Sequence, residues 1–91
     1  MQSSSVKFII RGRVQGVYYR VSVQALARQA GFNGYVKNLP TGEVEAYVNC
    51  QSKNLEKFIG ILKKGSKTSR VDEIRSITCQ NLALKGFEIK S

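Results

Sequence analysis

The sequence contains no histidine, and no aspartate or glutamate occurs before Glu43. Histidine is the commonest general base and the commonest metal ligand in proteins, so this chain has to work without either role of that residue. Only two cysteines are present, Cys50 and Cys79, and there is no CxxC motif. This pattern argues against a disulfide scaffold and against a cysteine-based zinc site. A single bridge between Cys50 and Cys79 stays open.

Long apolar runs are also missing. No stretch reaches the ~20 apolar residues that a membrane-spanning helix needs, and the polar, uncharged start of the chain is not typical of a signal peptide. A length of 91 residues with 42% hydrophobic residues predicts one globular domain, residues 1–91, with a modest core. We therefore expect a cytoplasmic protein with no membrane partner, and a monomer as the default.

Positive charge is abundant, with a formal net charge of +9. Six basic residues and no acidic residue precede Glu43. A field of this sign attracts phosphorylated metabolites, nucleic acid or an acidic surface. A simply solvated basic surface has the same composition, so charge alone does not choose among these partners.

Apolar periodicity predicts strands that alternate with two helices. The strands are expected at residues 6–10, 32–37, 43–50 and 71–80 with a bulge, and briefly around Phe87 and Ile89; the helices are expected at 21–30 and 54–64. Residues 38–42 form a turn, which makes the second and third strands a hairpin. In the third strand Val44, Ala46, Val48 and Cys50 face inward, and Glu43, Glu45, Tyr47 and Asn49 face outward. Ser52 or Asn54 is the expected cap of the second helix.

This order is βαββαβ followed by a short strand. Central strands joined by a hairpin and outer connections made by helices are typical of an α+β, ferredoxin-like two-layer sandwich. We expect an antiparallel sheet with both helices on one face, which leaves the other face wetter.

One segment between the first strand and the first helix is the best indicator of function. It reads Gly12-Arg13-Val14-Gln15-Gly16-Val17-Tyr18-Tyr19-Arg20. Backbone N–H groups at a helix start lack partners, and the helix dipole places partial positive charge there, so the segment suits an anion. Arg20 beside that positive end is unfavourable unless it faces a bound anion. A solvated Arg20 and ordinary turn glycines are the alternative reading.

The segment lacks the spacing of the common nucleotide-binding motifs, and it has no cysteine or carboxylate nearby. A site here would act by positioning and electrostatics, which favours a substrate with a good leaving group. A carboxylate leaves well because its conjugate acid has a pKa of about 4. A mixed anhydride of phosphoric and carboxylic acids therefore fits. Asn38 is the candidate that orients the attacking water, since its amide both donates and accepts; its alternative role is that of a turn residue.

Two parts of the chain resemble the signatures of the acylphosphatase family. The first is the segment of residues 12–20, and the second is Gly31-Phe32-Asn33-Gly34-Tyr35-Val36-Lys37-Asn38 with Gly42-Glu43-Val44-Glu45. The resemblance covers essentially the whole chain. It implies a ferredoxin-like enzyme that hydrolyses acyl phosphates to a carboxylate and inorganic phosphate without a metal or cofactor. Inorganic phosphate would then be a product or an inhibitor.

The resemblance also implies a role for each matching position. The phosphate would be bound by the backbone of Val14, Gln15, Gly16, Val17, Tyr18, Tyr19 and Arg20. Arg20 would be the phosphate-binding arginine, and Asn38 would orient the catalytic water. Tyr19 stands where phenylalanine is common in the family, and Thr41 stands where aspartate is common. The physiological acyl phosphate stays open.

Two other functions fit the same fold. RNA recognition domains share it and are basic, but they stack bases on aromatic residues of the central strands. Here Glu43 and Glu45 accompany Tyr47 on the outward positions, and carboxylates repel phosphate, so nucleic acid is the less favoured partner. The third reading is a domain that only binds anions or a protein. Arg20 and Asn38 together argue against it, since binding alone needs no water-orienting amide.

Overall fold

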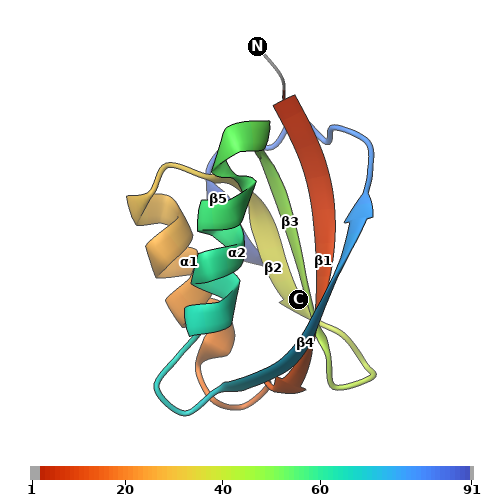
Figure 1. Cartoon of the computed structure of the whole chain (residues 1–91). Coiled ribbons are helices and arrows are strands. Elements are labelled where there is room, and N and C mark those ends of the chain that lie inside the picture. The colour runs from red at the N-terminus through yellow and green to blue at the C-terminus, as the bar shows by residue number, and fades with distance from the viewer. Residues whose placement is uncertain (1–2, 91) are drawn as a thin grey trace.

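The computed structural model describes residues 3–90, which form one sheet with two α-helices packed on one of its faces (Figure 1). The elements are β1 (Ser3–Arg13), α1 (Tyr19–Gln29), β2 (Asn33–Asn38), β3 (Val44–Gln51), the 3-10 helix η1 (Ser52–Asn54), α2 (Leu55–Lys64), β4 (Arg70–Thr78) and β5 (Phe87–Lys90). The predicted βαββαβ order with a short final strand is confirmed.

The strands lie in the order β4-β1-β3-β2-β5. β1 is antiparallel to both β3 and β4, and β2 and β3 form the predicted antiparallel hairpin, with Asn38 opposite Val44 at its closed end. The register of β1 and β4 shifts between Arg11 and Gly12, so Asp72 has no opposing residue. This irregularity is the bulge expected in the fourth strand.

The expectation of a purely antiparallel sheet is wrong, because β5 runs parallel to β2. Residues 79–86 cross the end of the sheet at which β1 and β2 begin. The Cys79 N–H donates to the Ser5 carbonyl in β1, and at the far side the Gly86 N–H donates to Asn33 Oδ1 in β2. A strand that starts from that end at the outer edge of β2 has to run in the same direction as β2.

The core lies between the sheet and the two helices. Val6, Phe8 and Ile10 alternate along β1 and are buried, as predicted, together with Val44, Ala46 and Val48 of β3. The Phe58 ring of α2 lies centrally, with its centroid 5.6 Å from Phe8, 5.2 Å from Phe32 and 5.8 Å from Phe87. Burying a side chain of this kind stabilises a fold by about 1.5–3 kcal/mol.

The face away from the helices is less open than the alternation predicts. Tyr47 does lie on this face, yet it is fully buried, and Glu45 is buried as well. The rings of Tyr35 and Tyr47 stack at 5.5 Å, and Tyr35 donates a 2.6 Å hydrogen bond to Glu45. The crossing segment covers Tyr47, whose hydroxyl accepts a 2.8 Å hydrogen bond from the Leu82 N–H. A contact so distant in sequence leaves no trace in local periodicity.

The expected side-chain cap of the second helix is absent. α2 is preceded by the 3-10 turn η1, and its N-cap residue Asn54 makes no side-chain cap hydrogen bond. The Ser52 hydroxyl lies 2.6 Å from that of Ser4 instead. Cys50 and Cys79 are free thiols, so the bridge left open by the sequence does not form.

Candidate active site

The loop between β1 and α1 ends in an open helix N-terminus. Tyr18 occupies the N-cap position in the left-handed conformation, with φ 62° and ψ 22°, and no side chain caps α1. Gly16 also has a positive φ of 74°, which glycine adopts without strain. The first turn of α1 contains no acidic residue. The free N–H groups and the helix dipole are therefore available to an anion.

A cavity of about 430 Å³ lies at this helix start. Its lining consists of Val14, Gly16, Tyr18, Tyr19, Arg20 and Val21. Five of the seven residues to which the family resemblance gave a phosphate-binding role thus meet at one cavity. Arg20 is half-buried there, and Tyr18 is exposed at its rim.

The two remaining loop residues, Gln15 and Val17, do not line this cavity, because they connect the loop to its supports. Val17 is buried in the core, and its carbonyl accepts hydrogen bonds from the hydroxyls of Ser66 (2.6 Å) and Thr68 (3.4 Å). Sequence reasoning missed both hydroxyls, which lie about 50 residues further along the chain. The polar composition of residues 65–70 was the one available signal.

Tyr19 anchors the start of α1 to the end of α2. Its side chain is buried, and its hydroxyl donates a 2.7 Å hydrogen bond to the Leu62 carbonyl. Burial raises the pKa of the Tyr19 hydroxyl well above its ordinary value, so the group stays protonated and keeps donating. The Tyr19 ring, next to Arg20 in sequence, is therefore held by packing in the core, and its hydroxyl is held by the hydrogen bond to Leu62.

Asn38 lies at the last position of β2, where the hairpin turn begins. Its Oδ1 atom is buried and has no hydrogen-bond partner within residues 3–90. A buried polar atom left in this way costs about 1–3 kcal/mol unless something else satisfies it. Buried polar atoms without a protein partner are commonly satisfied by bound water or a ligand. This position suits a residue that holds a water molecule.

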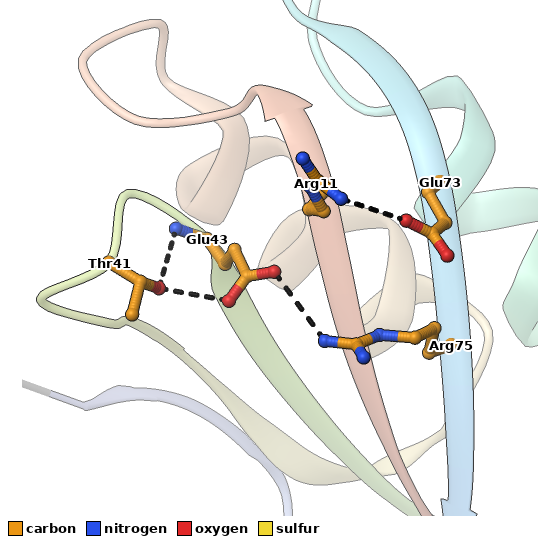
Figure 2. Close-up of polar contacts among 5 residues, drawn as sticks. All are labelled: Arg11, Thr41, Glu43, Glu73 and Arg75. Atoms are coloured by element: carbon orange, nitrogen blue, oxygen red, sulfur yellow. Dashed lines mark hydrogen bonds and ion pairs between the residues drawn. The ribbon is translucent and has the colours of Figure 1, made fainter.

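Two sets of contacts stabilise the turn after Asn38, one between backbone groups and one between side chains. The Leu39 N–H donates to the Glu43 carbonyl at 2.8 Å, which closes the turn. Figure 2 shows the second set: Thr41 Oγ1 donates to Glu43 at 2.9 Å, and the other carboxylate oxygen of Glu43 lies 3.7 Å from Arg75. Because β1 lies between β3 and β4, this ion pair reaches across a strand.

Carboxylates near this end of the sheet are already paired with other arginines. Arg11 pairs with Glu73 at 3.4 Å (Figure 2), and Arg70 pairs with Asp72 at 2.9 Å. Among the described residues, Arg20 has no carboxylate within 4 Å. Within residues 3–90, no ion pair therefore neutralises the positive charge of Arg20.

Among residues 3–90, no group of three or more histidine, cysteine, aspartate or glutamate side chains lies close enough to hold a metal ion. No helix in this range has the length and apolarity that crossing a membrane requires.

Fold and site together define a ferredoxin-like domain whose β1–α1 loop opens on a cavity at an uncapped helix start. The model of the acylphosphatase family matches residues 6–89. The chain is 39% identical over 90 residues to an acylphosphatase of Photobacterium profundum, covering 99% of this chain and 100% of the relative. It is 38% identical over 81 residues to an acylphosphatase of Thermus thermophilus, covering 89% and 92% respectively.

A solved structure agrees with these matches. The crystal structure of acylphosphatase from Bacillus subtilis superimposes with a TM-score of 0.88 at 33% identity, covering 96% of this chain and 98% of that one. The chain belongs to the acylphosphatase family, and its activity is that of an acylphosphatase, a hydrolase.

Proposed function

We propose that this chain hydrolyses the carboxyl–phosphate bond of acyl phosphates by in-line attack of water, without a metal or another cofactor. One observation carries the proposal: the uncapped start of α1 opens on a cavity lined by Arg20, which has no carboxylate partner among residues 3–90. Such a site combines a local positive potential with an unoccupied set of hydrogen-bond donors.

Arg20 and the loop backbone would hold the phosphoryl group. The planar guanidinium matches two phosphoryl oxygens at once, and N–H groups of residues 14–20 supply further donors. Because these donors are fixed by the fold before substrate arrives, they stabilise charge on the phosphoryl oxygens without reorganisation.

Asn38 would orient the attacking water through its buried Oδ1. The water oxygen forms the new bond to phosphorus while the bond from phosphorus to the acyl oxygen breaks. The electron pair of that bond leaves with the carboxylate. One water proton stays on the phosphate product, and the other passes to a phosphate oxygen or to solvent. Asn38 removes no proton, which fits a loose transition state that demands little of its nucleophile.

The acyl group would leave past the cavity rim. Tyr18 and Val21 are 80% and 55% exposed there, so neither is held in the core. An aromatic acyl group can pack against such side chains, which makes benzoyl phosphate a suitable probe.

The substrate class is an acyl phosphate, and inorganic phosphate is expected as product and competitive inhibitor. The monomeric state, the single domain of residues 1–91 and the cytoplasmic location stay predictions.

The helix-free face of the sheet adds a further argument against the nucleic-acid alternative. Its bases would have to stack on the helix-free face, where the central aromatic side chain, Tyr47, is 0% exposed. Base stacking requires an exposed ring face. Here the Tyr35 ring stacks on Tyr47, and the Leu82 N–H of the segment 79–86 bonds the Tyr47 hydroxyl.

The test follows hydrolysis of benzoyl phosphate in the presence of EDTA by the wild type, Arg20→Ala and Asn38→Ala. We expect Arg20→Ala to lose phosphate binding, and Asn38→Ala to lose most of its turnover while phosphate still inhibits the residual activity. Arg28→Ala and Asn54→Ala are the controls. Arg28 lies further along α1 and donates a hydrogen bond to the Phe87 carbonyl of β5. Asn54 lines a different cavity, together with Asn33 at the opposite end of β2 from Asn38. Turnover abolished by EDTA, or a fully active Asn38→Ala, would contradict the proposal.

A further inference from the structure

The side chain of Gln15 leaves the phosphate loop and reaches the β2–β3 turn. Its Nε2 atom donates two hydrogen bonds of 2.8 Å, one to the Leu39 carbonyl and one to the Glu43 carbonyl. Both bonds are partly buried and join residues 24 and 28 positions apart. Among the described residues, this is the one side chain of the segment 14–20 that bonds to the segment 38–43.

The two carbonyls do not need Gln15 for their own satisfaction. The Glu43 carbonyl already accepts the Leu39 N–H at 2.8 Å, and the Leu39 carbonyl accepts the Gly42 N–H at 3.1 Å. Each carbonyl oxygen has a second lone pair, and Gln15 uses that one. The turn therefore closes by itself, and the added bonds fix where the turn lies relative to the phosphate loop.

This relation matters because the two segments carry different halves of the proposed reaction. The segment 14–20 would hold the phosphoryl group, and Asn38, directly before Leu39, would hold the water. Attack in line requires both halves at a fixed separation and angle. We infer that Gln15 is a positioning residue for this hydrolysis: it sets the place of Asn38, and hence of the attacking water, against the phosphate loop. The inference rests on the proposed function.

The informative variant is Gln15→Met, which keeps the length of the side chain and removes its two donors. We expect kcat to fall, on the order of 10- to 100-fold, as for misplacements of about 1 Å in a reacting pair. Inhibition by inorganic phosphate should stay as in the wild type, because the loop backbone and Arg20 are untouched. Gln15→Glu should be as slow, since a carboxylate cannot donate to two carbonyls.

Gln24 provides the matched control. It is also a half-buried glutamine whose Nε2 donates to a backbone carbonyl, that of Phe87, at 3.1 Å, but it joins α1 to β5. Gln24→Met should lose comparable stability in urea unfolding and keep the wild-type kcat. A fall in kcat that simply followed lost stability would appear in both variants, and would overturn the inference.

A double-mutant cycle with Asn38→Ala identifies the route of the effect. If Gln15 acts through Asn38, Gln15→Met should slow the wild type but cost nothing further in the Asn38→Ala background. Equal slowing in both backgrounds would overturn the inference, and so would a Gln15→Met enzyme with the kcat of the wild type. If Asn38→Ala itself kept the wild-type turnover, the proposed water-orienting role would fail first, and this inference with it. A slow Asn38→Ala beside a fast Gln15→Met would reject the inference alone.

Discussion

The Tyr19 hydroxyl donates a 2.7 Å hydrogen bond to the carbonyl of Leu62, in the last turn of α2. The last four carbonyls of a helix have no partner inside the helix, and the tyrosine satisfies one of them. Phenylalanine, which is common at this position of the family, has no group that makes this bond. The departure at Tyr19 therefore ties the residue beside Arg20 to the second helix.

Tyr19→Phe should lower stability and leave catalysis unchanged. The lost hydrogen bond is worth about 0.5–1.5 kcal/mol. In a domain of this size, each kcal/mol corresponds to a Tm about 4–8 °C lower. Thermal unfolding followed by circular dichroism measures the shift, and benzoyl phosphate hydrolysis measures kcat. Tyr18→Phe is the control, because that neighbouring tyrosine is 80% exposed. An equal Tm for wild type and Tyr19→Phe would show that the bond contributes nothing net.

Gly65→Ala should disturb the same anchor more strongly. Gly65 has φ 52° and ψ −131°, and a Cβ atom there would lie 2.6 Å from Tyr19 Cε1 and 2.5 Å from Ser69 Oγ. Overpacking of this kind costs about 1–3 kcal/mol, and the positive φ adds strain. Because the Tyr19 ring has to move, we also expect weaker inhibition by inorganic phosphate.

Gly60→Ala is the matched control for that substitution. Gly60 lies inside α2, and a Cβ atom there would meet nothing within 4 Å. Replacing glycine by alanine in a helix interior should stabilise by about 0.5–1 kcal/mol. Opposite signs for the two variants in urea unfolding are the expected outcome. A stable Gly65→Ala with normal phosphate inhibition would mean that the Tyr19 ring is not needed where it lies.

The sequence was sufficient for those parts of the fold that local patterns determine. Alternation in β1 and β3 predicted the buried Val6, Phe8, Ile10, Val44 and Val48, and the turn residues predicted the hairpin. The direction of β5 was not accessible, because it depends on which end of the sheet residues 79–86 cross. The burial of Tyr47 was missed for the same reason, since the Leu82 N–H that bonds its hydroxyl is 35 residues away.

In the candidate site, too, the sequence revealed the features that depend on a local pattern and missed the contacts between distant segments. A glycine-containing loop before a helix is a local pattern, so Gly16 and Arg20 were recognisable from the sequence, and they do meet at one cavity. The support of Val17 by Ser66 and Thr68, and of the turn by Gln15, joins segments distant in sequence. The sequence pointed to the backbone of Gln15 but not to its side chain, and it did not point to Ser66 or Thr68, because glutamine, serine and threonine are ordinary loop residues.

A pH titration of Asp72 should show that Arg70 is paired with this carboxylate, and phosphate inhibition should show that Arg70 does not bind the anion. The hydrogen bond from Arg70 lowers the pKa of the Asp72 carboxyl below its ordinary 3.8. Because the pKa of Asp72 is lower in the folded state, the pair contributes its full stabilisation above the ordinary pKa of 3.8. This contribution is lost as the pH falls through the folded-state pKa. Carboxyl carbon NMR of wild type and Arg70→Gln measures the pKa, which should rise in the variant. Phosphate inhibition at neutral pH should stay unchanged; weaker inhibition would place Arg70 among the anion-binding groups.

Arg20→Lys tests whether the shape of the cation matters as well as its charge. Lysine keeps the positive charge beside the helix start, but its ammonium cannot form the two parallel hydrogen bonds of a guanidinium. Hydrogen bonds to charged groups are worth about 1.5–3 kcal/mol each, so phosphate should bind roughly 10- to 100-fold more weakly. Inhibition of benzoyl phosphate hydrolysis by inorganic phosphate measures this loss, and Arg28→Lys in the same helix is the control. If Arg20→Lys bound phosphate as tightly as the wild type, the loop would be holding the anion by net charge and backbone donors, and the bidentate geometry proposed for Arg20 would be wrong.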